Sequence, residues 1–244
     1  MKTVEPEVML VASTAINDAD MAYRGPFCTS VMDRGEGTDA EYLTEFAGRA
    51  CYESFHRPNP STADTRDYVR ATLFEKGHWS IAEHATATLY FTGVSRAFTH
   101  ELIRHRHLSY SQLSQRFVDE SEANIVLPPA LRKPPRAPEE LEARSAASNA
   151  LDAYDYIVDA LVYDQLVGAA QLLRKQAREA ARAVLPNMIE TKIVVTGNLR
   201  AWHEVIQRRS APDADAEMQE VMALAKDRLA TVAPTIFGEG AKVA

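Results

Sequence analysis

Residues 85–92, with the sequence ATATLYFT, alternate strictly between two kinds of side chain. A repeat of two places Ala85, Ala87, Leu89 and Phe91 on one face of an extended chain, and three threonines and a tyrosine on the other face. An antiparallel sheet with one face packed on a core has this pattern. The segment therefore predicts a half-buried β-strand.

The remaining elements are predominantly helical and separate the strands widely. Short strands are predicted at residues 8–12 and 189–196, with a further short strand at 125–127. Helical spacing of apolar residues predicts helices at 41–53, 61–76, 95–106, 139–167, 169–185, 198–209 and 213–230, with Ser95 and Asn198 as N-caps. Residues 107–116 form a polar stretch without a predicted element. This order favours an α+β or mixed α/β single domain, with a small sheet flanked by long helices.

Composition excludes several classes of protein. The chain has 244 residues with 27 Lys and Arg against 34 Asp and Glu, a net charge of −7, so nucleic acid is not an expected partner. Its two cysteines cannot build a disulfide framework. The N-terminal segment lacks the basic region and long apolar run of a signal peptide, and no apolar stretch suits a membrane span. We expect a cytoplasmic protein without a membrane partner.

Positive charge is nevertheless concentrated in three places in the sequence. The first cluster has no acidic residue between Glu101 and Asp119, and the others lie on predicted helices. The three clusters are Arg104, His105, Arg106, His107 and Arg116; Arg174, Lys175, Arg178 and Arg182; and Arg200, Arg208 and Arg209. Solvated helix faces are one interpretation. Arginine guanidinium groups among serines and glutamines instead favour binding of the phosphate of a small molecule.

Metal and nucleophile chemistry have weaker support. His100 and Glu101 begin the His-Glu-x-x-His zinc motif, but Arg104 occupies the position of the second histidine, so no metal site is predicted. Cys51 lies within a predicted helix, and no Ser-His-Asp order identifies Ser114 as a nucleophile. We therefore expect a cofactor to supply the chemistry.

The segment RHRHLSYSQLSQRF, residues 104–117, resembles the R-H-R-x7-S signature of the flavin-dependent thymidylate synthases, with Ser114 as the final serine. Similar segments are EFAGRACYES, GHWSIAEH, THELIR, RKQAREAARAVLPN, TKIVVTGNLRAW and TVAPTIF. The resemblance implies one catalytic domain over residues 1–244. Residues 1–38 would be a variable N-terminal strand and loop, and residues 39–237 the family-like body.

The resemblance also implies an activity. It is the reductive methylation of dUMP at C5 to dTMP in de novo dTMP biosynthesis, by a methyltransferase. Methylenetetrahydrofolate would donate the carbon, and NADPH would be the reductant through FAD. The family forms homotetramers with active sites between subunits. An alternative is a non-catalytic nucleotide- or RNA-binding protein of the same fold.

Site residues follow from the same resemblance. Arg209 would favour the N3-ionised uracil and Ser114 would lie close to the pyrimidine, so these two are the predicted catalytic residues. The predicted dUMP contacts are Glu101, Arg104, Gln112, Leu113, Ser114, Gln115, Arg116, Arg182 and Arg209. The predicted FAD contacts are Ser80, Arg104, His105, Arg106, Gln112, Asn198, Leu199 and Arg200. His78 would lie over the flavin or folate face.

One residue departs from the family pattern. Glu204 stands where the family usually has a flavin-contacting histidine, and His203 lies one position earlier. A carboxylate near a flavin phosphate is unfavourable. Either Glu204 turns away from the site, or this chain holds the flavin less tightly.

Overall fold

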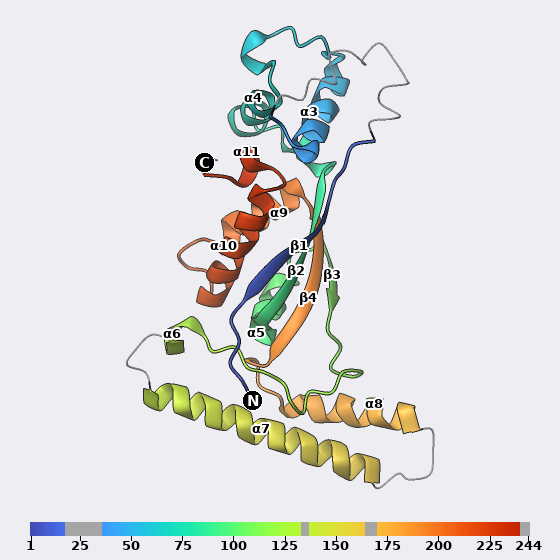
Figure 1. Cartoon of the computed structure of the whole chain (residues 1–244), viewed down its shortest axis with the longest axis vertical. Helices are drawn as coiled ribbons and strands as arrows, with labels where there is room; N and C mark the ends of the chain where they lie inside the picture. The colour runs from blue at the N-terminus through green and yellow to red at the C-terminus, as the bar shows by residue number, and fades with distance from the viewer. Residues whose placement is uncertain (18–35, 133–136, 164–169, 240–244) are drawn as a thin grey trace.

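A four-stranded antiparallel sheet forms the centre of the protein in a computed structural model, which describes residues 1–17, 36–132, 137–163 and 170–239 (Figure 1). The strands are β1 (Glu7–Ser13), β2 (Thr86–Ser95), β3 (Leu108–Gln112) and β4 (Glu190–Asn198), in the spatial order β1-β2-β4-β3. The predicted α+β class with a small sheet and long helices is confirmed.

The alternation in β2 divides the sheet into an apolar and a polar face. Leu89 and Phe91 are completely buried, whereas Thr88 is half-buried and shares a 2.9 Å hydroxyl hydrogen bond with Thr196 of β4. The half-buried strand is thus confirmed. Its pairing with β4 is irregular around Gly93, which has a φ of +64° and packs against the backbone of Glu5, so a side chain cannot be accommodated there.

Four helices cover the apolar face: α5 (Arg96–Leu102), α9 (Leu199–Arg209), α10 (Ala216–Ala230) and α11 (Pro234–Phe237). The predicted caps hold, because Ser95 accepts from the Phe98 amide and Asn198 from the Ala201 amide. Trp202 of α9 is fully buried and donates from Nε1 to the carbonyl of Ala87 at 3.1 Å. This bond fixes α9 against the sheet.

Further helices lie at the two ends of the molecule (Figure 1). At the upper end are α3 (Asp39–Tyr52), α4 (Thr65–Arg70), a π-helical turn (Ala71–Glu75) and short 3-10 helices (Pro60–Thr62 and Trp79–Glu83). At the lower end are α6 (Pro129–Arg132), α7 (Ala137–Tyr163), α8 (Ala170–Ala181) and a 3-10 turn (Arg182–Val184). No helix in the described ranges is long and apolar enough to cross a membrane.

Several sequence predictions were wrong in detail. The polar stretch 107–116 contains β3, which pairs with β4, and the helix expected to reach residue 106 ends at Leu102. The Tyr110 hydroxyl on β3 lies 2.8 Å from the carbonyl oxygens of both Leu102 and His105, so its one proton serves the last carbonyl of α5 and a carbonyl of the following loop. A contact with β3, which the residues of the helix itself do not reveal, therefore sets the C-terminal end of α5.

Other boundaries also differ. Residues 61–76 divide into a 3-10 turn, α4 and a π-helical turn, and the last long helix begins at Ala216. Ile125 makes isolated bridges with Thr3 and Ile189 in place of a strand. The predicted break between the two long helices, at residue 168, lies outside the described residues.

Candidate functional site

Strand β3 separates the predicted site residues into two groups at its opposite ends. Leu108 pairs with Gly197 near the start of α9, whereas Gln112 pairs with Ile193 farther down β4. The upper group surrounds the loop 103–107, and the lower group surrounds residues 113–116. Five strand residues span about 15 Å, so the two groups lie at opposite ends of β3 in one chain.

Arg209 is the centre of the upper group. Its Nε donates to Nε2 of His105 at 2.9 Å, and its Nη2 donates to the Glu101 carbonyl at 3.2 Å. The Glu101 carboxylate lies 3.2 Å from Nη1, and the Arg209 side chain is 18% exposed. Helix α5 and the following loop thus contact all three nitrogens of the guanidinium.

The His105 imidazole is neutral at physiological pH. Burial, together with the nearby Arg209 and Arg208 guanidinium groups, lowers the pKa of His105 to about 4. Since Nε2 accepts from Arg209, the ring proton belongs on Nδ1. A neutral imidazole can therefore contact the guanidinium without charge repulsion.

Two small cavities lie beside the loop 103–107 and α9. The Arg200 cavity, of about 200 Å³, is lined by Glu83, His107, Asn198, Arg200, Ala201 and Glu204. The Arg104 cavity, of about 260 Å³, is lined by Arg104, His105, Arg106, His107, Ala201, Glu204, Val205 and Arg208. Both cavities share His107, Ala201 and Glu204, so Glu204 stands between them. Four arginines suit an anionic ligand with more than one phosphate.

Glu204 does not turn away from this region. Its carboxylate accepts from Arg200 Nε at 2.9 Å, while Glu83 accepts from Arg200 Nη1 at 2.7 Å. Both ion pairs are partly exposed. An anionic ligand that approaches Arg200 must therefore compete with two carboxylates.

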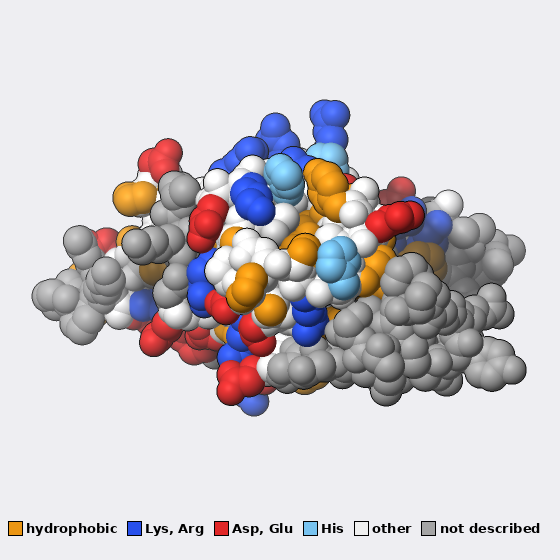
Figure 2. All heavy atoms as spheres, turned by 90° about the horizontal axis from the view of Figure 1, so that it is seen from above, with side chains coloured by type: hydrophobic (Ala, Val, Ile, Leu, Met, Phe, Trp, Pro, Cys, Tyr) orange, Lys and Arg blue, Asp and Glu red, His pale blue; other side chains and the backbone are white. Residues whose placement is uncertain are grey.

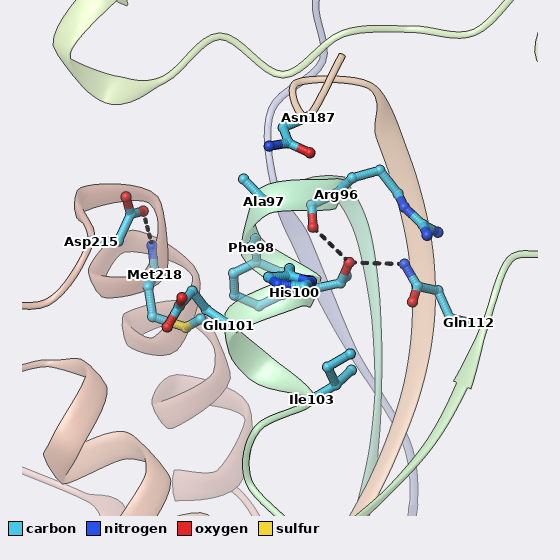
Figure 3. Close-up of a pocket in the computed structure, with 11 residues that line it drawn as sticks. Arg96, Ala97, Phe98, His100, Glu101, Ile103, Gln112, Asn187, Asp215 and Met218 are labelled. Atoms are coloured by element: carbon cyan, nitrogen blue, oxygen red, sulfur yellow. Dashed lines mark hydrogen bonds between the residues drawn. The ribbon is translucent and has the colours of Figure 1, made fainter. Parts of the chain in front are cut away.

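A third cavity, of about 460 Å³, runs along α5 (Figure 3). Two predicted residues line this α5 cavity, Glu101 and Gln112, and the Gln112 amide donates to Thr99 Oγ1 at 2.8 Å. Arg96 and Asn187 also line it, and the sequence reasoning did not select them. The one sequence signal for Arg96 is its position immediately after Ser95, the N-cap of α5. Burial lowers the pKa of Arg96, and Arg182 lowers it in addition.

The lower group lies beside the end of α8. Leu113 is joined to Lys192 of β4 by a 2.9 Å backbone bond, and Ser114 begins a turn in which Gln115 is buried. Arg116 lies 3.6 Å from Glu179 of α8. Arg182, in the turn that follows α8, is exposed. The first and second basic clusters of the sequence therefore meet here.

The remaining predicted residues flank α9. His78 and Ser80 are exposed at the start of the 3-10 helix Trp79–Glu83. The Leu199 side chain is completely buried, so only its backbone is available to a ligand, and the Asn198 side-chain oxygen is used as the cap of α9. His203, adjacent to Glu204, instead stacks on Trp79 with ring centroids 4.0 Å apart.

The surface at the upper end of the molecule carries side chains of several kinds. Figure 2 shows basic and histidine side chains next to apolar ones, with acidic side chains scattered among them. Such a mixed surface differs from the continuous basic face that binds duplex nucleic acid.

Comparisons with known proteins place these features in context. Residues 35–235 match the family described as "Thymidylate synthase complementing protein". A flavin-dependent thymidylate synthase of Mycobacteroides abscessus is 51% identical over 206 residues, which cover 83% of this chain and 81% of that protein. One from Corynebacterium aurimucosum is 46% identical over 242 residues, covering 98% and 92% of the two chains.

Solved structures share the fold at lower identity. Thymidylate synthase X from Helicobacter pylori, crystallised with FAD and dUMP, gives a TM-score of 0.63 at 18% identity and covers 98% of this chain and 100% of that one. The UMP/dUMP methylase PolB of Streptomyces cacaoi, bound with 5-Br dUMP, gives 0.65 at 19% identity, covering 95% and 93%.

Proposed function

Because the chain belongs to the family of flavin-dependent thymidylate synthases, it is an FAD-dependent enzyme that converts dUMP to dTMP, and we propose how its residues divide that work. The proposal rests chiefly on the Arg209 cluster, where a half-buried guanidinium is held by α5 with its remaining donors available. Methylenetetrahydrofolate is the proposed carbon donor and NADPH the proposed reductant. Residues 1–244 act as a single catalytic domain in this proposal.

The Arg200 and Arg104 cavities fit a flavin dinucleotide. Arg104, Arg106 and Arg200 offer forked donors to its phosphates, and the backbone at Leu199 begins a helix, whose N-terminus favours anions. Ser80, His105, Gln112 and Asn198 complete the proposed flavin contacts, with His78 over the flavin or folate face. When bound, the flavin supplies the redox chemistry of the methyl transfer.

The nucleotide site is proposed to use residues from two subunits. Glu101, Arg104 and Arg209 lie at one end of β3, whereas Gln112, Leu113, Ser114, Gln115, Arg116 and Arg182 belong to its other end. The α5 cavity brings Glu101 and Gln112 together, but its lining includes neither Arg209 nor the Ser114–Arg116 turn. We therefore propose a homotetramer in which one subunit supplies the Arg209 group and a neighbour supplies the Ser114–Arg116 group.

Arg209 is the proposed electrostatic catalyst. The C5 carbon of uracil becomes nucleophilic when N3 loses its proton and the ring carries negative charge. A guanidinium directed at that edge stabilises the charge, and it needs little reorganisation because His105 and Glu101 already hold it. Ser114 contacts the pyrimidine from the other half of the site, and Arg116 and Arg182 bind the phosphate.

Glu204→His should tighten FAD binding by about tenfold. The substitution removes a carboxylate from Arg200 and so frees one side of the guanidinium for a phosphate. Quenching of flavin fluorescence measures the affinity. Asp67→Asn is a matched control, since it removes a carboxylate from another partly exposed arginine pair that lines neither cavity. Equal affinities of wild type and Glu204→His would show that the ion pair does not limit flavin binding.

The proposed function is tested with purified protein and dUMP carrying tritium at C5. The protein should be yellow, and tritium release should require methylenetetrahydrofolate and NADPH. A protein that binds dUMP and takes up no flavin, or never releases tritium, would support the alternative of a non-catalytic nucleotide-binding protein.

A further inference from the structure

Each nitrogen of the Arg209 guanidinium has one contact. The His105 imidazole accepts from Nε, the Glu101 carbonyl accepts from Nη2, and the Glu101 carboxylate lies near Nη1. A guanidinium has five N–H donors in a rigid plane, so two donors remain for a ligand. Because Nε is bound by His105, rotation of the plane about the Cδ–Nε bond would break that bond. His105 thus determines which way the two remaining donors point.

The loop that holds His105 is itself anchored. Tyr110 lies on β3, and its hydroxyl is 2.8 Å from the carbonyl oxygen of His105 and 2.8 Å from that of Leu102. The His105 amide in turn donates to the Leu102 carbonyl at 3.1 Å. The position of the imidazole is therefore linked to strand β3 of the sheet.

We propose that His105 is a positioning residue for the reaction, whose side chain orients Arg209 toward the nucleotide. This rests on the proposed role of Arg209 and extends it to a second residue. The resemblance assigns His105 to the flavin, and the bond of its Nε2 to Arg209 gives the same residue a second role at the nucleotide.

The test compares two substitutions of His105 in the full enzyme. His105→Leu removes the acceptor and should lower kcat by about 10-fold to 100-fold, the range for a lost hydrogen bond to a charged group. His105→Gln retains a side-chain acceptor and should recover part of the lost kcat. Because both variants also lose the proposed imidazole contact to the flavin, kcat is measured at saturating FAD, and FAD affinity is measured separately by fluorescence quenching. Thermal unfolding establishes that both variants are folded.

A double-mutant cycle with Arg209→Ala separates positioning from direct action. If His105 acts through Arg209, His105→Leu should produce no further loss of kcat in the Arg209→Ala background. His56→Leu removes an exposed histidine that lines none of the three cavities and serves as the control for loss of an imidazole. Independent, multiplying losses would overturn the inference, as would a kcat of His105→Gln no higher than that of His105→Leu. Unchanged kcat in Arg209→Ala alone would instead overturn the proposed role of Arg209.

Discussion

Arg209→Ala should lower the turnover of dUMP by about 100-fold to 1000-fold, the effect of removing one preorganised donor to a developing negative charge. The guanidinium is held in place before substrate binds by His105 and Glu101, so little of its stabilisation is lost to reorganisation. Steady-state rates of tritium release from C5-labelled dUMP measure the change. Flavin content should fall far less, because Arg209 lines neither the Arg200 cavity nor the Arg104 cavity.

Arg209→Lys is the matched variant for this prediction. Lysine keeps the positive charge but lacks the planar fork, so it should recover only part of the lost rate. A comparable loss of flavin and turnover in Arg209→Ala would contradict a role on the substrate. It would show instead that Arg209 maintains the flavin site.

Glu45→Ala should destabilise the protein by about 3–5 kcal/mol, because it leaves a buried positive charge without its partner. The Glu45 side chain is 1% exposed and pairs with Arg49, which is 5% exposed. Its other oxygen accepts from Thr65 Oγ1 at 2.6 Å, and Arg57 lies 3.3 Å away. These bonds join α3 to α4 at the upper end of the molecule. Urea unfolding measures the change in the free energy of unfolding.

Asp67→Asn provides the comparison for the loss of an exposed pair. Asp67 and Arg70 are more than half exposed, so their separation should cost less than about 1 kcal/mol. If Glu45→Ala were no more destabilising than Asp67→Asn, the buried ion pair would not be a source of stability for the α3–α4 region.

The sequence predicted those features whose cause is local. The alternation of β2 and the caps at Ser95 and Asn198 depend on neighbouring residues, and the structure confirms them. Strand β3 was missed because it is polar and is stabilised by backbone bonds to β4, which is distant in the sequence. The end of α5 was misplaced for a related reason, since the Tyr110 hydroxyl that satisfies its last carbonyl comes from β3.

In the site, too, local features were predictable and contacts between distant residues were not. Its arginines could be selected from sequence by their clustering and by the resemblance. Their partners could not, because the contacts of Arg209 with His105 and of Arg200 with Glu83 each join residues more than a hundred positions apart. Arg96 and Asn187 became candidates only when α5 was seen to border a cavity. The separation of the two half-sites likewise depends on the register of β3 against β4.

The division of the nucleotide site between subunits is tested most directly by mixing two inactive variants. Arg209→Ala disables one half of each site and Arg116→Ala the other, so each homo-oligomer should be nearly inactive. In oligomers co-expressed at equal levels, about a quarter of the sites should combine two intact halves and recover tritium release from C5-labelled dUMP. No recovery in oligomers shown to contain both variants would contradict a site shared between subunits.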